Sequence, residues 1–314
     1  MERKYKSLTI VVPCYNEEEV VKIFYEECCK ILGDIKDYSF EFIFINDGSK
    51  DNTLKEIEKI AAIDERVIYL SFSRNFGKEA AILAGMEYSK SDLVVIMDAD
   101  LQHPPRLLPE MINYIEDGYD SVATRRTDRK GEAKFRKYFS EKFYKYINKI
   151  SDINITEGAT DFRMMNRQMV ESILSVKEYH RFSKGIFEWV GYDTKWIDYE
   201  SEDRVAGETK WSFWGLLKYA IEGMVSFSTS PLRISSITGL IISTFSFIYF
   251  LYTLIKTLIM GIDMPGYAST ICILTFVGGI QLIALGIIGE YLARTYMESK
   301  KRPNYFIKDT NSKK

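Results

Sequence analysis

The sequence predicts an α/β protein in which a doubly wound sheet is followed by interfacial helices and a C-terminal hairpin of two transmembrane helices. Short apolar runs alternate with helical patterns through the N-terminal part of the chain. Polar segments follow these runs, and two long uncharged segments lie near the C-terminus. Alternation of strand and helix is typical of a parallel sheet covered on both faces.

The apolar runs are short and rich in β-branched and aromatic residues, as buried parallel strands are. They cover Leu8–Val12, Phe40–Ile45, Val67–Phe72 and Leu93–Met97. Helical patterns lie between and after them, at Glu17–Leu32, Asp51–Ala62, Lys78–Tyr88 and Pro105–Asp117.

The two uncharged segments are long enough to cross a bilayer. One runs for 22 residues from Ile234 to Ile255 and the other for 23 residues from Tyr267 to Gly289. At about 1.5 Å per residue, each reaches roughly 33 Å or more, against a hydrocarbon core of about 30 Å. The alternative, two buried helices of a soluble protein, is disfavoured because two such runs in tandem are hard to bury in a chain of this size.

The tail after Arg294 is rich in lysine and arginine, and the positive-inside rule places it in the cytoplasm. Two spans then place the N-terminal part there too. The prediction is a multi-pass protein of the cytoplasmic membrane with its catalytic domain and both termini in the cytoplasm. Small residues such as Gly278 and Gly286 could pack the spans within one chain or between chains of a homo-oligomer.

Composition excludes several other classes of protein. With 42 Lys and Arg against 44 Asp and Glu, the net charge is −2, which argues against nucleic acid as the main partner. Hydrophobic residues make up 46% of the chain, so most of it is not disordered. Only 2 His and 4 Cys are present, so a metal would be held by oxygen ligands.

The polar segments at three strand ends predict a ligand site at one edge of the sheet. Asp98 and Asp100 follow the fourth apolar run, with Gln102 next in the loop. Two carboxylates and an amide oxygen suit Mg²⁺ or Mn²⁺, which keep positions open for phosphate oxygens. The alternative is a pair of helix-capping aspartates before Pro104.

The other two strand ends also have structural alternatives. Asp47 could contact a ligand or lie in a turn before a helix cap. Tyr15 and Glu17 could hold a base and a ribose, or simply begin a helix with acids at its positive end. Their common location at one sheet edge favours a site for a nucleotide diphosphate.

Four segments, VVPCYNEEE, INDGSKDNT, RNFGKEAAILAG and VIMDADLQHPP, resemble glycosyltransferase family 2, which has the GT-A fold. The segments GATDFRMMNR and RVAGETKW, with the two spans, resemble the polyprenyl-phosphate glycosyltransferases. That group includes dolichol-phosphate mannose synthases and bactoprenol glucosyltransferases of the GtrB kind. The resemblance covers residues 6–295. Asn46 departs from it, because many relatives have Asp there.

The resemblance implies roles for individual residues. Pro13, Tyr15 and Glu17 would line the nucleotide, with Asp47 on the base and Lys78 near the donor. Asp98, Asp100 and Gln102 would hold the metal and the donor diphosphate. Asp161 would lie beside the sugar and the acceptor phosphate. Arg204 and Lys210 would reach the phosphates from a loop, with Asp100, Asp161 and Arg204 forming the catalytic set.

A basic segment is expected to bind the lipid acceptor. Residues 125–149 hold ten basic and three acidic side chains, and aromatic residues recur at helical spacing. Such a segment beside a membrane domain is typical of an interfacial helix that attracts anionic headgroups. Arg125, Arg136 and Ser140 are the predicted ligands of the lipid phosphate. The alternative is a solvated charged face over an aromatic core stripe.

These observations divide the chain into four parts. The predicted GT-A core covers residues 1–124 and the acceptor-side, juxtamembrane region covers 125–230. The transmembrane region covers 231–295, with helices at about 234–257 and 267–291, and a basic tail covers 296–314.

The predicted activity is transfer of a sugar, first of all glucose from UDP-glucose, to polyprenyl (undecaprenyl) phosphate with inversion, for modification of cell-envelope glycans. Three alternatives remain: a processive polysaccharide synthase, a nucleotide-binding membrane scaffold without catalysis, and a soluble nucleotidyltransferase. The first usually has a Q-x-x-R-W segment and more spans, and the last is disfavoured by the hairpin. Intact Asp98, Asp100, Asp161 and Arg204 argue against the scaffold.

Overall fold

A computed structural model describes residues 4–35, 37–127, 148, 156, 158–200, 225, 228–260 and 266–313. Within these residues, eight strands form one sheet in the order β7-β5-β6-β4-β1-β2-β3-β8. The strands are β1 (Ser7–Cys14), β2 (Ser39–Asn46), β3 (Val67–Phe72), β4 (Leu93–Ile96), β5 (Ser121–Arg126), β6 (Ala159–Asn166), β7 (Thr194–Tyr199) and β8 (Ile307–Thr310).

The middle of the sheet is the parallel set that the sequence predicts. Strands β4, β1, β2 and β3 are parallel neighbours. Strand β6 is antiparallel to β4 and β5, and β8 is antiparallel to β3. The sheet is therefore mixed, and it extends past the predicted core boundary at residue 124. The sequence interpretation did not identify β5 to β8: β5 continues the strand–helix alternation after the helix expected at Pro105–Asp117 but ends in the basic segment, and β6 to β8 lie in the regions assigned to the acceptor side and to the tail.

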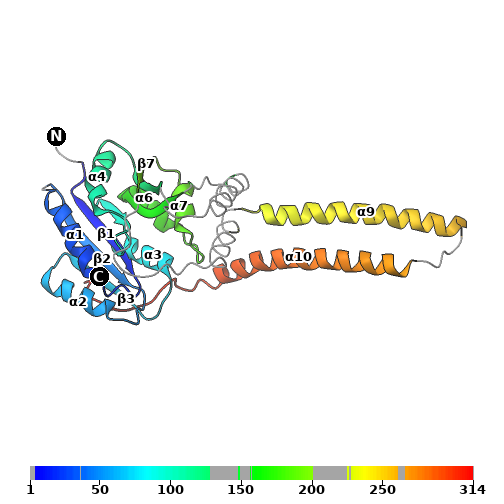
Figure 1. Ribbon diagram of the computed structural model, residues 1–314, viewed down its shortest axis with the longest axis horizontal. Helices are drawn as coiled ribbons and strands as arrows, with labels where there is room; N and C mark the ends of the chain where they lie inside the picture. The colour runs from blue at the N-terminus through cyan, green and yellow to red at the C-terminus, as the bar shows by residue number, and fades with distance from the viewer. Residues whose placement is uncertain are drawn as a thin grey trace.

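Helices cover both faces of the sheet (Figure 1). One face carries α1 (Val21–Gly33), α2 (Thr53–Ile63) and α4 (Leu108–Glu116), which continues a short 3-10 turn, η1 (Pro105–Leu107). The other face carries α3 (Lys78–Tyr88), α6 (Arg167–Ser175) and α7 (Ser183–Trp189). Alternation along β1 explains the two cores: Ile10 and Val12 pack on the first face and Val11 on the second.

Helix α3 lies close to the sheet because of a glycine. A Cβ at Gly85 would be 2.2 Å from Cγ1 of Val11, closer than any real contact. The residues of α3 from Ala80 to Met86 are buried, several of them small. This packing fixes the start of α3, and with it Lys78, at the sheet edge where β1 and β2 end.

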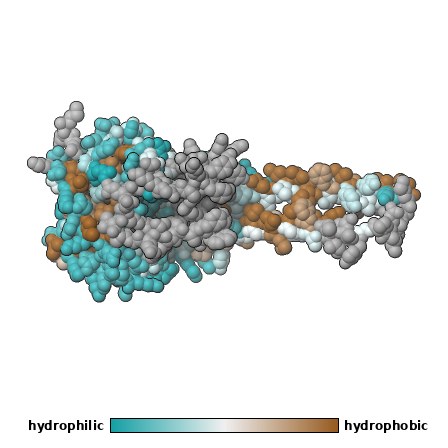
Figure 2. Space-filling model, in the orientation of Figure 1, coloured by the Kyte–Doolittle hydropathy of each residue, from teal (hydrophilic) through white to brown (hydrophobic). Residues whose placement is uncertain are grey.

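The C-terminal hairpin consists of α9 (Ser230–Met260) and α10 (Tyr267–Ser299), which run side by side away from the sheet (Figure 1). Its large apolar side chains are exposed; Leu240 and Phe245, for example, are 68% and 70% exposed. Figure 2 shows these apolar residues gathered along both helices, in contrast to the hydrophilic surface of the sheet domain. By length and composition, Ser230–Thr253 and Ile273–Ser299 could each cross a membrane.

The chain after α10 returns to the sheet domain instead of ending as a free tail. Strand β8 pairs with β3, and the Tyr305 ring stacks on Phe72 with 4.9 Å between centroids. Asn304 donates to the carbonyls of Glu178 and Tyr179. The segment predicted as a basic tail is therefore partly the eighth strand.

Candidate functional site

The predicted site lies at the edge of the sheet where the parallel strands end. The register pairs Cys14 of β1 with Asn46 of β2, and Val11 of β1 with Ile96 of β4. The loops after these three strands therefore meet at one edge. A positive φ at Asn16 (57°) and Leu101 (58°) turns the chain sharply within two of these loops.

Asp98 and Asp161 come together through the register of β4 and β6. These antiparallel strands pair Ile96 with Arg163, and the same register extended by two positions sets Asp161 opposite Asp98. Nζ of Lys78 lies between them, 2.7 Å from Oδ1 of Asp98 and 2.6 Å from Oδ2 of Asp161. Three side chains that are far apart in sequence thus form one charged cluster.

The cluster is strongly ionised. Burial alone would lower the pKa of Lys78, but the carboxylates of Asp161 and Asp98 outweigh burial and raise the pKa above its usual value. Burial alone would raise the pKa of Asp161, but the charges of Lys78 and Lys184 hold it well below its usual value. The pKa of Asp98 is likewise lowered, because the charge of Lys78 outweighs the effect of burial. Asp161 is therefore a weak base in this state.

His103 is a buried neighbour of Asp98 that accepts a hydrogen bond from its backbone. It is 6% exposed, its ring stacks on Phe162 with 5.3 Å between centroids, and its Nδ1 accepts the backbone N–H of Asp98 at 3.3 Å. Burial lowers the pKa of His103, which keeps Nδ1 available as an acceptor. The sequence interpretation gave His103 no role. It is one of two histidines in the chain and directly follows the loop of Asp98 and Asp100, which could have marked it as a residue of the site.

Asp100 occupies a turn instead of the strand. Strand β4 ends at Ile96, four residues before Asp100. Oδ1 of Asp100 accepts the backbone N–H of Gln102 at 3.1 Å. Among the described residues, no three His, Cys, Asp or Glu side chains are grouped as metal ligands. Asp98, Asp100 and Gln102 nevertheless share one loop, and their oxygen atoms suit a hard divalent cation.

Asp47 holds the loop that leads to Lys78. It is 3% exposed, and its carboxylate accepts the backbone N–H groups of Phe76 at 2.6 Å and Gly77 at 2.9 Å. Burial raises the pKa of Asp47 despite these two hydrogen bonds. Both carboxylate oxygens of Asp47 are thus already bonded to backbone N–H groups. This structural role was not part of the expectation that Asp47 contacts the nucleotide base.

The loops after β1 and β2 are joined by hydrogen bonds. The backbone N–H of Asn16 donates to Oγ of Ser49 at 3.0 Å, and that of Glu17 donates to Oγ1 of Thr53 at 2.8 Å. Pro13 lies near the end of β1, and the Tyr15 ring is 40% exposed at the same edge. An exposed ring is available to stack on a planar ligand. Asn46, the departure from the family pattern, donates to Oγ of Ser71 at 2.9 Å and so holds β2 to β3.

The predicted acceptor residues are placed only in part. Arg125 at the end of β5 forms a bidentate ion pair with Asp198 of β7, at 2.7 and 2.9 Å. An acceptor phosphate would have to compete with Asp198 for this guanidinium. Arg136, Ser140, Arg204 and Lys210 lie outside the described residues, as does most of the basic segment.

A second group of contacts supports the cluster from α7. Glu79, which follows Lys78, accepts hydrogen bonds from both the N–H and the hydroxyl of Ser183. Lys184 donates to the carbonyl of Ala159 at 3.0 Å, and Arg163 pairs with Glu188 at 2.7 Å. One helix thus braces the elements that carry Lys78 and Asp161.

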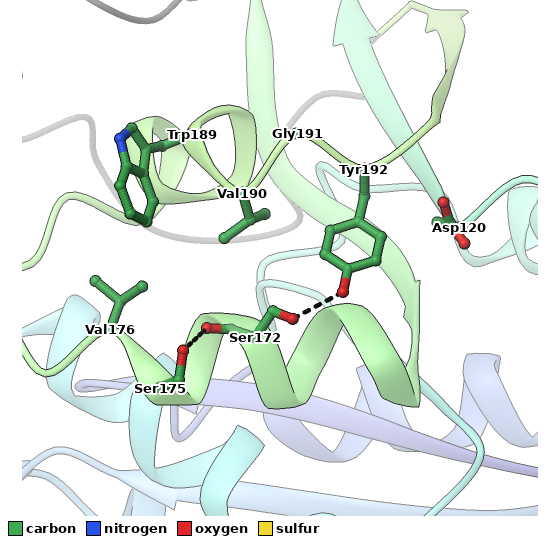
Figure 3. Close-up of a pocket in the computed structure, with 8 residues that line it drawn as sticks. All are labelled: Asp120, Ser172, Ser175, Val176, Trp189, Val190, Gly191 and Tyr192. Carbon is green, nitrogen blue, oxygen red and sulfur yellow. Dashed lines mark hydrogen bonds between the residues drawn. The ribbon is translucent and has the colours of Figure 1, made fainter.

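One cavity in the described part of the chain lies away from this site. It measures about 470 Å³ and is lined by side chains of α6 and of the segment around Trp189 and Tyr192, with Asp120 at its rim (Figure 3). Asp120 accepts from Asn166, which pairs with Leu93 at the start of β4, whereas Asp98 follows the end of that strand. The cavity is therefore at the opposite edge of the sheet.

Comparison with known proteins places the chain in a family. The model for Glycosyl transferase family 2 matches residues 9–174, and that for the GtrB C-terminal hairpin matches residues 230–295. The Escherichia coli (strain K12) protein named prophage bactoprenol glucosyl transferase homolog is 43% identical over 96% of this chain and 98% of its own length. The bactoprenol glucosyl transferase of Shigella phage SfV is 42% identical over 98% of this chain and 99% of its own.

Among solved structures, glucosyl-3-phosphoglycerate synthase from Mycobacterium tuberculosis, in complex with Mn²⁺, UDP-glucose and phosphoglyceric acid, is 17% identical with a TM-score of 0.45. The match covers 71% of this chain and 78% of that one. The two family matches and the full-length relatives agree with the charged sheet edge and the apolar hairpin described above. The chain therefore belongs to glycosyl transferase family 2, as a membrane-associated hexosyltransferase of the bactoprenol glucosyl transferase type.

Proposed function

We propose that the protein transfers glucose from UDP-glucose to a polyprenyl phosphate, with inversion at the anomeric carbon. The observation that carries this proposal is the convergence of Asp98, Lys78 and Asp161 at the carboxyl edge of a parallel sheet, in a chain that ends in an apolar hairpin. The names of the full-length relatives support glucose and bactoprenol as the substrates. Undecaprenyl phosphate is the first acceptor to test.

The reaction needs no strong base. An acceptor phosphate oxygen forms the new bond to the anomeric carbon as the bond from that carbon to the donor diphosphate breaks, and UDP leaves. A phosphate monoester has its second pKa near 6, so the nucleophile is already largely dianionic at neutral pH. Asp161, whose pKa is lowered by Lys78, suits orientation of the sugar and acceptor better than proton abstraction.

The chain's own groups bind and position the substrates. Asp98, Asp100 and Gln102 would hold Mg²⁺ or Mn²⁺, which would stabilise the departing diphosphate. Pro13, Tyr15, Glu17 and Asp47 would form the nucleotide side of the site. Arg204 and Lys210 would bind phosphates, and Arg125, Arg136 and Ser140 would receive the lipid phosphate.

The membrane arrangement follows from the same proposal. The hairpin would anchor the enzyme in the cytoplasmic membrane with its catalytic domain and both termini on the cytoplasmic side. The lysines and arginines after Arg294 support this orientation. The lipid phosphate would then be presented at the bilayer surface, beside the base of the hairpin.

A transfer assay tests the proposal. Purified full-length protein is incubated with undecaprenyl phosphate, Mg²⁺ or Mn²⁺, and a panel of radiolabelled nucleotide sugars, and label is counted in the organic phase. We expect the unmodified protein to transfer label from UDP-glucose. Asp100→Ala should reduce the transferred label at least about a hundredfold. Asp117→Ala, which changes an exposed aspartate at the end of α4, should leave transfer unchanged. Nucleotide binding without transfer from any donor would contradict the proposal and favour the scaffold.

A further inference from the structure

The ammonium of Lys78 occupies the position that a metal cation bound to Asp98 would need. Nζ lies 2.7 Å from Oδ1 of Asp98 and 2.9 Å from Oδ2, so both oxygens of this carboxylate face it. The same ammonium lies 2.6 Å from Asp161. A divalent cation that bound Asp98 would have to take these oxygens from Lys78.

The backbone of Lys78 is held in place, but its side chain can move. Asp47 fixes Phe76 and Gly77 immediately before it, and Ser183 fixes Glu79 immediately after it. Gly77 has a φ of 97°, which sets the direction in which α3 begins. The side chain of Lys78 is 42% exposed, and its flexible four-carbon stem allows the ammonium to swing away without moving the helix.

We propose that Lys78 is an internal counter-cation of the donor site. Without donor, its ammonium holds Asp98 and Asp161 together and competes with the divalent cation for Asp98. When donor and metal arrive together, the ammonium moves from Asp98 to the donor diphosphate. The inference rests on the proposed function only in that it takes Asp98 as a metal ligand and a diphosphate as the donor group.

The physical reason is the balance of charge. Displacement of Lys78 by metal alone would leave an ammonium beside a newly bound divalent cation, with Asp161 as its remaining carboxylate partner in the described part of the site. Like charges at such separations repel strongly where water is partly excluded. The donor diphosphate brings negative charge that can receive the displaced ammonium. Metal binding is therefore expected to be weak alone and strong in the presence of nucleotide.

The test measures metal binding without turnover. Mn²⁺ affinity is determined for the full-length protein in detergent by the electron paramagnetic resonance of free Mn²⁺, with and without UDP. Lys78→Met is compared with Lys184→Met, which removes a neighbouring charge that acts on Asp161 but whose amine is bonded to the carbonyl of Ala159. Lys78→Arg keeps the charge at the same position.

Without UDP, we expect Lys78→Met to bind Mn²⁺ at least tenfold more tightly than the unmodified protein. Lys184→Met should change the affinity less than threefold, and Lys78→Arg should leave it weak. UDP should strengthen Mn²⁺ binding much more in the unmodified protein than in Lys78→Met. If Lys78→Met does not fold, Lys78→Gln replaces it, since the amide removes the charge but retains a hydrogen-bond donor for both carboxylates.

Equal or weaker Mn²⁺ binding by the folded, uncharged variant would overturn the inference. The outcome is separate from that of the transfer assay. Sugar transfer by the unmodified protein, together with unchanged Mn²⁺ affinity in Lys78→Met, would contradict the counter-cation role but not the proposed function. Tighter Mn²⁺ binding without any sugar transfer would leave the counter-cation role intact and contradict the proposed function.

Discussion

The backbone N–H of Ser73 donates a hydrogen bond to the carbonyl of Phe306, 2.9 Å away. Ser73 follows β3 and opens the loop that ends at Lys78, whereas Phe306 lies beyond the membrane hairpin. The Phe306 ring also packs on Phe76, with 6.1 Å between centroids. The chain that follows the apolar hairpin is therefore bound directly to the loop that positions the site lysine.

Removal of this attachment should weaken both the fold and the site. Tyr305 stacks on Phe72 and its hydroxyl is bonded to Glu87, so we expect Tyr305→Ala to lower the free energy of unfolding by about 1–3 kcal/mol. The KM for the donor should rise as the loop loosens. Thermal unfolding in detergent and donor kinetics measure the two effects. Lys308→Ala, an exposed position in β8, is the control and should change neither.

The turn at Gly48 should tolerate no side chain. Gly48 has a φ of 63°, and a Cβ there would lie 2.5 Å from the backbone carbon of Arg74. We expect Gly48→Ala to destabilise the protein by about 1–3 kcal/mol and to lower donor affinity, because the loop on Asp47 would shift. Gly33→Ala is the control, since a Cβ there meets nothing within 4 Å. Equal melting temperatures for the two variants would contradict this account of the turn.

The buried ion pair between Arg163 and Glu188 should be costly to break. Arg163 is 2% exposed, packs over the rings of Phe187 and Trp196, and has Glu188 as its charged partner at 2.7 Å. Glu188→Gln removes the carboxylate that is paired with the buried guanidinium, and we expect a loss of about 3 kcal/mol or more. Denaturant unfolding measures it. Glu110→Gln, at an exposed position of α4, is the control and should change the free energy of unfolding little. An equally small change in Glu188→Gln would argue against a stabilising ion pair.

The pH dependence of transfer should reflect the acceptor instead of Asp161. The lowered pKa of Asp161 means that its ion pair is lost only as the pH falls through that lowered value; the raised pKa of Lys78 means that its charge is lost only as the pH rises above its usual range. Both groups therefore stay ionised between about pH 5 and pH 9.

We expect kcat/KM for the acceptor to fall about tenfold per pH unit below about pH 6, where the phosphate gains its second proton. Protonation of His103, whose pKa burial lowers from its usual value, would also give an acid limb. His103→Asn is therefore the control. An acid limb that disappears in this variant would assign the titration to His103 instead of the acceptor.

The sequence was sufficient where local patterns carry the information. The expected strand at Val67–Phe72 and the expected helix at Lys78–Tyr88 have those same bounds in the structure. The other expected strands and helices differ by a few residues at their ends, except that α10 continues to Ser299, beyond the expected end at about residue 291. The apolar segments form the two long helices, and Glu290 pairs with Arg294, four residues later, at 3.4 Å. These features depend on hydrophobic periodicity and helical spacing, which can be read along one stretch of chain.

By itself, the sequence thus determined the α/β class, the polar sheet edge with Asp98 and Asp161 as candidates, and the apolar hairpin. Only the tertiary structure decided which groups meet: that Lys78 lies between the two aspartates, that Asp47 holds the loop before it, that Arg125 is paired with Asp198, and that β8 returns to β3. The physical reason is that these contacts join residues far apart in the chain. They follow from strand register and from the packing of α3 and α7, which no local pattern encodes.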